Sequence, residues 1–185
     1  MTKEIVDKAK ERMEKAAAAT GHELGGIRTG RATTGILDRV FVDYYGTKTP
    51  IKQAANISVP EPQLLVIQPW DKSMLAAIEK AILQSDLGLT PANDGQLIRL
   101  PFPPLSEERR KDMVKLVKKL CEEGRVAVRN IRRDANEHLK ESEKKHDISE
   151  DDLERAEEEV QRLTDKYIAE IDELLKAKEK EIMEV

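Results

Sequence analysis

The sequence contains little that covalent or metal chemistry requires. Its one cysteine, Cys121, excludes an internal disulfide and favours a reducing compartment. Its histidines are far apart, at His22, His138 and His146, so none has the clustered spacing of a metal site. No acid pair, triad or phosphate-binding glycine loop stands out, since "GGIRTGRATTG" follows a predicted helix rather than a strand. We therefore expect no catalytic residues, no bound metal and no cofactor.

Long apolar runs are also missing. The charged N-terminal segment "MTKEIVDKAKERMEK" lacks the apolar stretch of a signal peptide, so we expect a soluble cytoplasmic protein without membrane contact. Aromatic residues make up 3% of the chain and charged residues 37%, which is typical of exposed helices around a thin apolar seam. The net charge of −4 argues against general nucleic-acid binding. An anionic partner would have to meet a local basic patch.

Prolines and aromatics are concentrated in the middle of the chain. Residues 31–105 contain all eight prolines and five of the six aromatics, whereas both flanks have the apolar periodicity of helices. The sequence therefore predicts an α+β protein of two domains. A helical domain, residues 1–30 and 106–185, is interrupted by an inserted small α/β domain, residues 31–105.

The flanks predict three long helices. Thr2 is the expected cap of the first, Ser106 after "PFPPL" caps the second, and Ser149 with Asp152 has the spacing of a capping box before the third. Each helix carries a narrow apolar stripe that it cannot bury alone, which favours a three-helix bundle.

The inserted domain is predicted to mix strands with one helix. "VFVDYYG" and "LLVIQPW" are rich in β-branched and aromatic residues, and "NISV" and "LIRLP" are shorter candidates. The helix "SMLAAIEKAILQSDLG" has Ser73 as its expected cap. Asp71 and Asp94 occupy turn and cap positions, where a structural role is the default over a catalytic one.

The second helix carries a segregated basic flank. On a helical wheel with Ile131 at zero, one band between about 100° and 160° contains no acidic residue from 111 to 136. Its members are Lys111, Lys118, Arg125, Arg129, Arg132 and Asn136. Arg133 lies outside the band and is expected to face solvent. The band is either a docking surface for phosphates, which the planar guanidinium fits well, or a solvated surface paired with acidic neighbouring helices.

Several blocks resemble the bacterial ribosome recycling factor family. They run in order along the whole chain and include "IRTGRA", "VDYYGTKTPIKQAANI", "RLPFPPLSEERRKDMVK" and "RVAVRNIRRDAN". The resemblance implies a long three-helix bundle and a small α/β domain in an L-shaped, tRNA-like outline. It also implies that the arginines at Arg110, Arg129 and Arg132 contact ribosomal RNA. Arg28 and Arg31, beside Gly30, join them as candidates, while Arg125 and Lys118 come from the wheel.

The resemblance further implies a non-enzymatic translation factor. Its expected partners are the 50S subunit with its 23S rRNA, the 70S post-termination complex, and elongation factor G, with which it splits the ribosome into subunits. We expect a monomer. The predicted hinge between the domains comprises Gly30, Arg31, Pro103, Pro104 and Leu105. The alternative from another class is a helical scaffold for protein interactions, whose stripes pair with partner helices.

Overall fold

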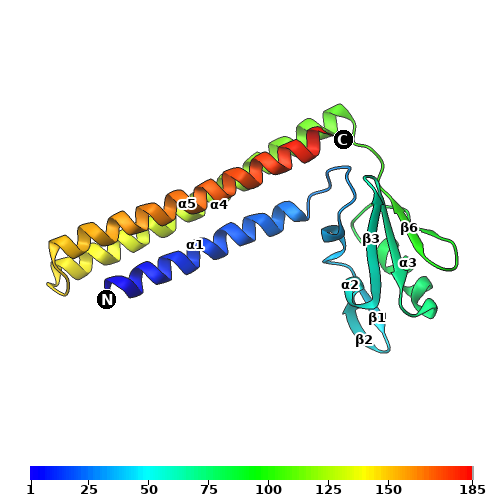
Figure 1. Ribbon diagram of the computed structural model, residues 1–185, viewed down its shortest axis with the longest axis horizontal. Coiled ribbons are helices and arrows are strands. Elements are labelled where there is room, and N and C mark those ends of the chain that lie inside the picture. The colour runs from blue at the N-terminus through cyan, green and yellow to red at the C-terminus, as the bar shows by residue number, and fades with distance from the viewer. Residues whose placement is uncertain (185) are drawn as a thin grey trace. The chain divides into compact units, whose positions relative to one another are not determined.

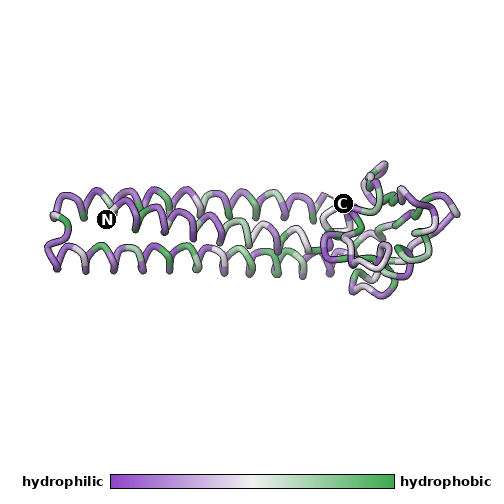
Figure 2. Tube along the Cα trace, turned by 90° about the horizontal axis from the view of Figure 1, so that it is seen from below, coloured by the Kyte–Doolittle hydropathy of each residue, from purple (hydrophilic) through white to green (hydrophobic). Residues whose placement is uncertain are grey.

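The computed structural model describes residues 1–184. Within them, three long helices form a bundle: α1 (Thr2–Gly25), α4 (Glu107–Lys144) and α5 (Glu150–Met183). Figures 1 and 2 show these helices side by side, and the colours of Figure 2 show apolar and polar residues alternating along each. The predicted fold class, a three-helix bundle with an inserted small sheet domain, is confirmed.

Each long helix begins near the predicted residue. Ser106 caps α4, because its side-chain oxygen accepts a hydrogen bond from the Arg109 backbone N–H at 3.3 Å. Ser149 and Asp152 form the predicted capping box before α5, with the Asp152 N–H 3.1 Å from the Ser149 hydroxyl. The prediction for Thr2 was wrong: Thr2 is the first helical residue, and the Met1 carbonyl accepts from the Ile5 N–H.

The inserted segment contains more short elements than the sequence predicted. A hairpin of β1 (Phe41–Tyr44) and β2 (Thr47–Pro50) leads through α2 (Ile51–Ala54) into an antiparallel sheet. The sheet has the order β3-β4-β6-β5. Its strands are β3 (Ala55–Glu61), β4 (Leu64–Pro69), β5 (Ala92–Asn93) and β6 (Ile98–Pro101). Two short 3-10 helices, η1 (Thr34–Leu37) and η2 (Lys72–Met74), and the helix α3 (Leu75–Leu83) complete it.

The core of this segment lies between α3, the hairpin and one face of the sheet. Alternate residues of β4 and β6 are fully buried there, including Leu65, Ile67, Ile98 and Leu100. The prediction that Ser73 caps the helix was wrong. Asp71 caps η2 instead, and its carboxylate accepts from the Ser73 N–H at 3.0 Å.

The contacts divide the chain into two compact units. One comprises Met1–Leu24 and Val114–Lys180, and the other Gly25–Met113 and Glu181–Val185. The predicted boundaries, 1–30 with 106–185 and 31–105, and the L-shaped outline stay predictions. Within residues 1–184, no helix combines the length and apolar character that crossing a membrane requires.

Candidate nucleic-acid interface

The buried face of α4 determines where its arginines lie. The residues buried along this helix are Val117, Cys121, Gly124, Val128, Ile131, Ala135 and Leu139. They recur at three- and four-residue intervals, so they form one stripe against α1 and α5. The basic band follows one border of that stripe. Its arginines Arg125, Arg129 and Arg132 are therefore half-buried, while Arg133 on the outer surface is exposed, as predicted.

Among the charged residues of the band, Arg125 is held by the most carboxylate contacts. Its Nε and Nη2 both lie 2.7 Å from the Asp172 carboxylate of α5, and its Nη1 lies 2.8 Å from Glu122. Only 17% of its side chain is exposed. Desolvation lowers its pKa, but the hydrogen bonds to Asp172 and Glu122 outweigh that effect and raise the pKa. Arg125 therefore joins α4 to α5 and presents little free guanidinium to a ligand.

Arg129 shares Glu122 with Arg125. Its Nη1 lies 3.1 Å from the Glu122 carboxylate, and 39% of its side chain is exposed. Hydrogen bonds from Arg125 and Arg129 lower the pKa of Glu122, so this carboxylate stays ionised at neutral pH. Arg129 is thus less enclosed than Arg125, and Glu122 is its carboxylate partner.

Arg132 has a neutral neighbour instead of an acid. Its Nη1 donates to the side-chain oxygen of Gln161 on α5 at 3.4 Å, a long hydrogen bond. An open groove begins at this pair and runs toward the distal end of α4. Its lining has four basic side chains, two amides and two carboxylates: Arg132, Arg133, Lys140, Lys144, Asn136, Gln161, Glu137 and Glu141. Arg132 itself has a neutral hydrogen-bond partner, whereas Arg125 and Arg129 have carboxylate partners.

The other predicted members lie in different surroundings. Lys118 is 61% exposed and forms a 3.5 Å ion pair with Glu179. Lys111 pairs with Glu107 within the first turn of α4. Arg110 is half-buried near the start of α4, where its N–H donates to the Ser106 carbonyl at 2.9 Å. The bundle thus brings Lys118, Arg125, Arg129 and Arg132 onto one flank of α4.

Arg28 and Arg31 follow the end of α1. Arg31 is exposed and Arg28 is half-buried, with its guanidinium close to Gly88. Gly30 between them has a φ of 78°, a left-handed conformation that glycine adopts without strain. Thr29 is buried and donates to Glu181 at 2.9 Å. The chain therefore turns at Gly30 while its neighbours are held by specific contacts.

Pairing of the band with acidic neighbouring helices was one of the two predicted alternatives, but the individual carboxylates were not identified from the sequence. Glu122 lies near 180° on the wheel, just outside the band, yet its side chain reaches back to two arginines. Glu122 precedes Arg125 by three residues and Arg129 by seven, and this helical spacing could have indicated the contacts from the sequence. The contacts of Asp172 and Glu179 depend on the register between α4 and α5, which the sequence pattern does not give.

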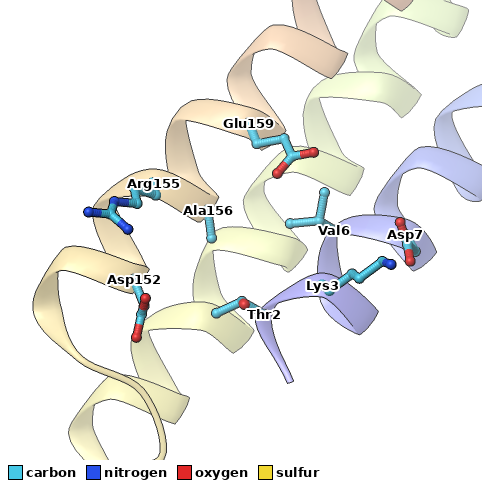
Figure 3. Close-up of a pocket in the computed structure, with 8 residues that line it drawn as sticks. All are labelled: Thr2, Lys3, Val6, Asp7, Asp152, Arg155, Ala156 and Glu159. Atoms are coloured by element: carbon cyan, nitrogen blue, oxygen red, sulfur yellow. The ribbon is translucent and has the colours of Figure 1, made fainter.

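The other candidate sites within residues 1–184 have structural roles or mixed charge. No group of three or more metal-ligating side chains occurs within residues 1–184. The Asp94 carboxylate accepts from the N–H groups of Gln96 and Leu97, which is the structural role predicted for it. Figure 3 shows a pocket at one end of the bundle, where α1 meets α5. Its walls carry charges of both signs, so it favours neither anions nor cations: Lys3, Asp7, Asp152, Arg155 and Glu159.

The fold is a bundle of three long helices with an inserted α/β segment, and one flank of α4 is basic. Comparison with known proteins identifies the family. The sequence model described as "Ribosome recycling factor" matches residues 20–183. Ribosome-recycling factors of Halalkalibacterium halodurans and Geobacillus thermodenitrificans are 60% and 59% identical over 185 residues, covering 100% of each chain. The chain belongs to the ribosome recycling factor family.

Solved structures agree with this assignment. A solution structure of the ribosome recycling factor matches with a TM-score of 0.85 at 49% identity, covering 100% of this chain and 98% of the other. A second match has a TM-score of 0.73 at 47% identity and covers 99% of both chains. It belongs to models of the T. thermophilus ribosome recycling factor and the E. coli elongation factor G bound to the E. coli post-termination complex.

Proposed function

We propose that this protein is a non-enzymatic translation factor that recycles ribosomes after termination. It docks on RNA of the large subunit and, together with elongation factor G, separates the post-termination ribosome into subunits in the cytoplasm. Full-length identity of about 60% to ribosome-recycling factors is the observation that carries this proposal. The structural relative bound beside elongation factor G on a post-termination complex supports the choice of partner.

The docking surface that we propose is the basic flank of α4. Arg132 and Arg129 are its principal contacts, because their guanidinium groups are partly exposed and not fully occupied by carboxylates. Lys118 and Arg110 extend it toward the start of α4, and Arg28 and Arg31 are further candidates. Arg125 supports the flank through Asp172 rather than by contacting RNA directly. The contacts are to phosphates and RNA shape, since the flank offers no aromatic side chain for stacking on bases.

The moving part of the mechanism is proposed to be the crossing between the bundle and the inserted segment. The chain crosses this hinge twice. One crossing segment is Gly30 and Arg31, and the other is Pro103, Pro104 and Leu105. The positive φ of Gly30 and the exposed, non-helical prolines support this assignment. A proline fixes φ, so a crossing of this kind bends over a limited range. Elongation factor G, a GTPase, supplies the energy, and this protein transmits it to the contacts between the ribosomal subunits.

Co-sedimentation with 50S subunits at two salt concentrations tests the docking surface. A protein held by several phosphate contacts loses affinity steeply as salt rises, because bound counterions are released from the RNA. A flat salt response would contradict docking on phosphates and would favour the protein scaffold. A splitting assay with 70S complexes, elongation factor G and GTP tests the function itself. Failure to separate subunits under conditions in which a known recycling factor succeeds would overturn the proposal.

A further inference from the structure

Glu122 places a negative charge inside the proposed docking surface. Its carboxylate lies 2.8 Å from Nη1 of Arg125 and 3.1 Å from Nη1 of Arg129. The Glu122 side chain is 53% exposed, so it faces the same solvent from which RNA approaches. A phosphate that binds Arg129 from this side would meet a fixed carboxylate within the same cluster.

The three arginines of the flank therefore differ in how far a carboxylate occupies them. Arg125 is bound by two carboxylates, Glu122 and Asp172. Arg129 is bound by one, and Arg132 meets only the neutral amide of Gln161 among its hydrogen-bond partners within residues 1–184. Access for phosphate rises along α4 in that order. A ligand that reaches one or two arginines gains little at Arg129, because it must displace Glu122 or tolerate its charge.

We infer that Glu122 is a specificity determinant of the docking surface, acting as an internal competitor with phosphate for Arg129. RNA that presents phosphates in the right positions to Arg132 and its neighbours offsets the loss of the Glu122 contact. A flexible polyanion, which engages the flank one phosphate at a time, does not. Discrimination then comes from a repulsive element as well as from attractive ones. This inference rests on the proposed function, since it requires the α4 flank to bind RNA.

The test compares Glu122→Gln with Glu123→Gln. Both substitutions remove one negative charge, and both residues are exposed. Glu123 lies on the opposite flank of α4, near 280° on the wheel, so Glu123→Gln is a matched control for net charge. Fluorescence anisotropy of labelled protein measures affinity for poly(U) as the non-specific probe, and co-sedimentation measures affinity for 50S subunits. Circular dichroism confirms that each variant is folded.

We expect Glu122→Gln to bind poly(U) about two- to fivefold more tightly than the unsubstituted protein, the scale of one exposed charge pair. Glu123→Gln should change the affinity for poly(U) by less than about 1.5-fold, as expected for a distant charge screened by salt. Affinity for 50S subunits should rise less, so the ratio of specific to non-specific binding falls. Glu122→Ala, which cannot accept a hydrogen bond, should behave like Glu122→Gln.

Two results would overturn the inference. If Glu122→Gln and Glu123→Gln changed the affinity for poly(U) equally, the change would come from net charge alone and not from the position of Glu122. Weaker poly(U) binding by Glu122→Gln would show that the carboxylate organises the arginines for RNA instead of competing with it. Failure of the proposed function has a separate signature: the unsubstituted protein itself would then bind 50S subunits with no salt dependence or not at all.

Discussion

A Cβ atom on Gly124 would collide with the side-chain oxygen of Thr20. It would also lie 3.3 Å from Cδ1 of Ile171, so α1 and α5 both lie close to α4 at this point. Thr20 is buried, and its hydroxyl donates to the Ala16 carbonyl at 3.0 Å, which holds it in this place. A glycine in the middle of a long helix thus has a packing reason here.

Gly124→Ala is expected to destabilise the bundle despite the better helix propensity of alanine. The propensity gain is at most about 1 kcal/mol, whereas overpacking of a core costs about 1–3 kcal/mol. We expect a net decrease of about 1–2 kcal/mol in the free energy of unfolding, measured by urea denaturation. Gly21→Ala is the control, because its Cβ would meet Cδ1 of Leu174 at an ordinary 3.5 Å. That variant should be as stable as the parent or slightly more stable.

The Thr20→Ala/Gly124→Ala double variant tests the mechanism. Removal of the Thr20 oxygen leaves room for the new methyl group, so the double variant should recover part of the stability lost by Gly124→Ala. The two substitutions should therefore couple favourably in a double-mutant cycle. Additive effects would show that the Thr20 side chain is not the source of the strain.

The same position shows what the sequence predicts and where it stops. Periodicity placed Gly124, Val128 and Ile131 on one apolar stripe, and all three are buried. It gave the start of α4 at Ser106 because capping is a local interaction. It did not give the partners of Gly124, since the register between helices depends on side chains that are distant in sequence.

The inserted segment and the basic flank of α4 also contain contacts that depend on residues distant in sequence. The strand β2 has the sequence "TKTP", which carries neither apolar alternation nor β-branched bulk beyond its threonines, and it forms by pairing with β1. The basic flank was predicted from the wheel, because it is a property of one helix. The ion pair of Arg125 with Asp172 spans 47 residues and joins two helices. No spacing rule within one helix predicts it.

Arg125→Ala is expected to affect stability more than Arg129→Ala. Arg125 loses hydrogen bonds to two carboxylates at a site with 17% exposure, which we expect to cost about 1–3 kcal/mol in unfolding free energy. Arg129 is more exposed and shares one carboxylate, so its loss should cost less than about 1 kcal/mol. Urea unfolding of both variants measures the difference. Equal stability of the two would contradict a structural role for Arg125.

Arg132→Ala is expected to weaken binding to 50S subunits without a large change in stability. Loss of one charge-assisted contact to phosphate should cost about 1–3 kcal/mol of binding free energy. The matched control is Arg162→Ala, because Arg162 is 79% exposed on α5 and its ion pair is with Glu158 in the same helix. Co-sedimentation at a fixed salt concentration compares them. Equal losses would assign the effect to net charge instead of to the α4 flank.

Substitution of Pro103 and Pro104 by alanine tests the proposed hinge. Both prolines are exposed, so the change should leave the fold and the α4 flank intact. Each alanine frees one φ angle, at an entropic cost of about 0.4–1 kcal/mol for ordering the crossing. With two alanines the costs add, so we expect the rate of subunit splitting to fall about four- to thirtyfold while affinity for 50S subunits is retained. Pro60→Ala, at an exposed position of β3, is the control. An unchanged splitting rate would contradict the hinge.

The capping box before α5 predicts how stability depends on pH. Hydrogen bonds from the hydroxyl and the N–H of Ser149 lower the pKa of Asp152 in the folded protein. An acid with a lowered folded-state pKa stabilises the fold above its unfolded pKa, near 4 for Asp, and this stabilisation is lost as pH falls through the folded-state value. Asp152→Asn should therefore lower Tm at pH 7, and the difference from the parent should shrink below about pH 4. Asp151→Asn, next to it in the first turn of α5, lacks the Ser149 bonds and should have a smaller effect at pH 7. A Tm difference for Asp152→Asn that stays constant down to about pH 2 would show that the ionised carboxylate does not stabilise this helix start.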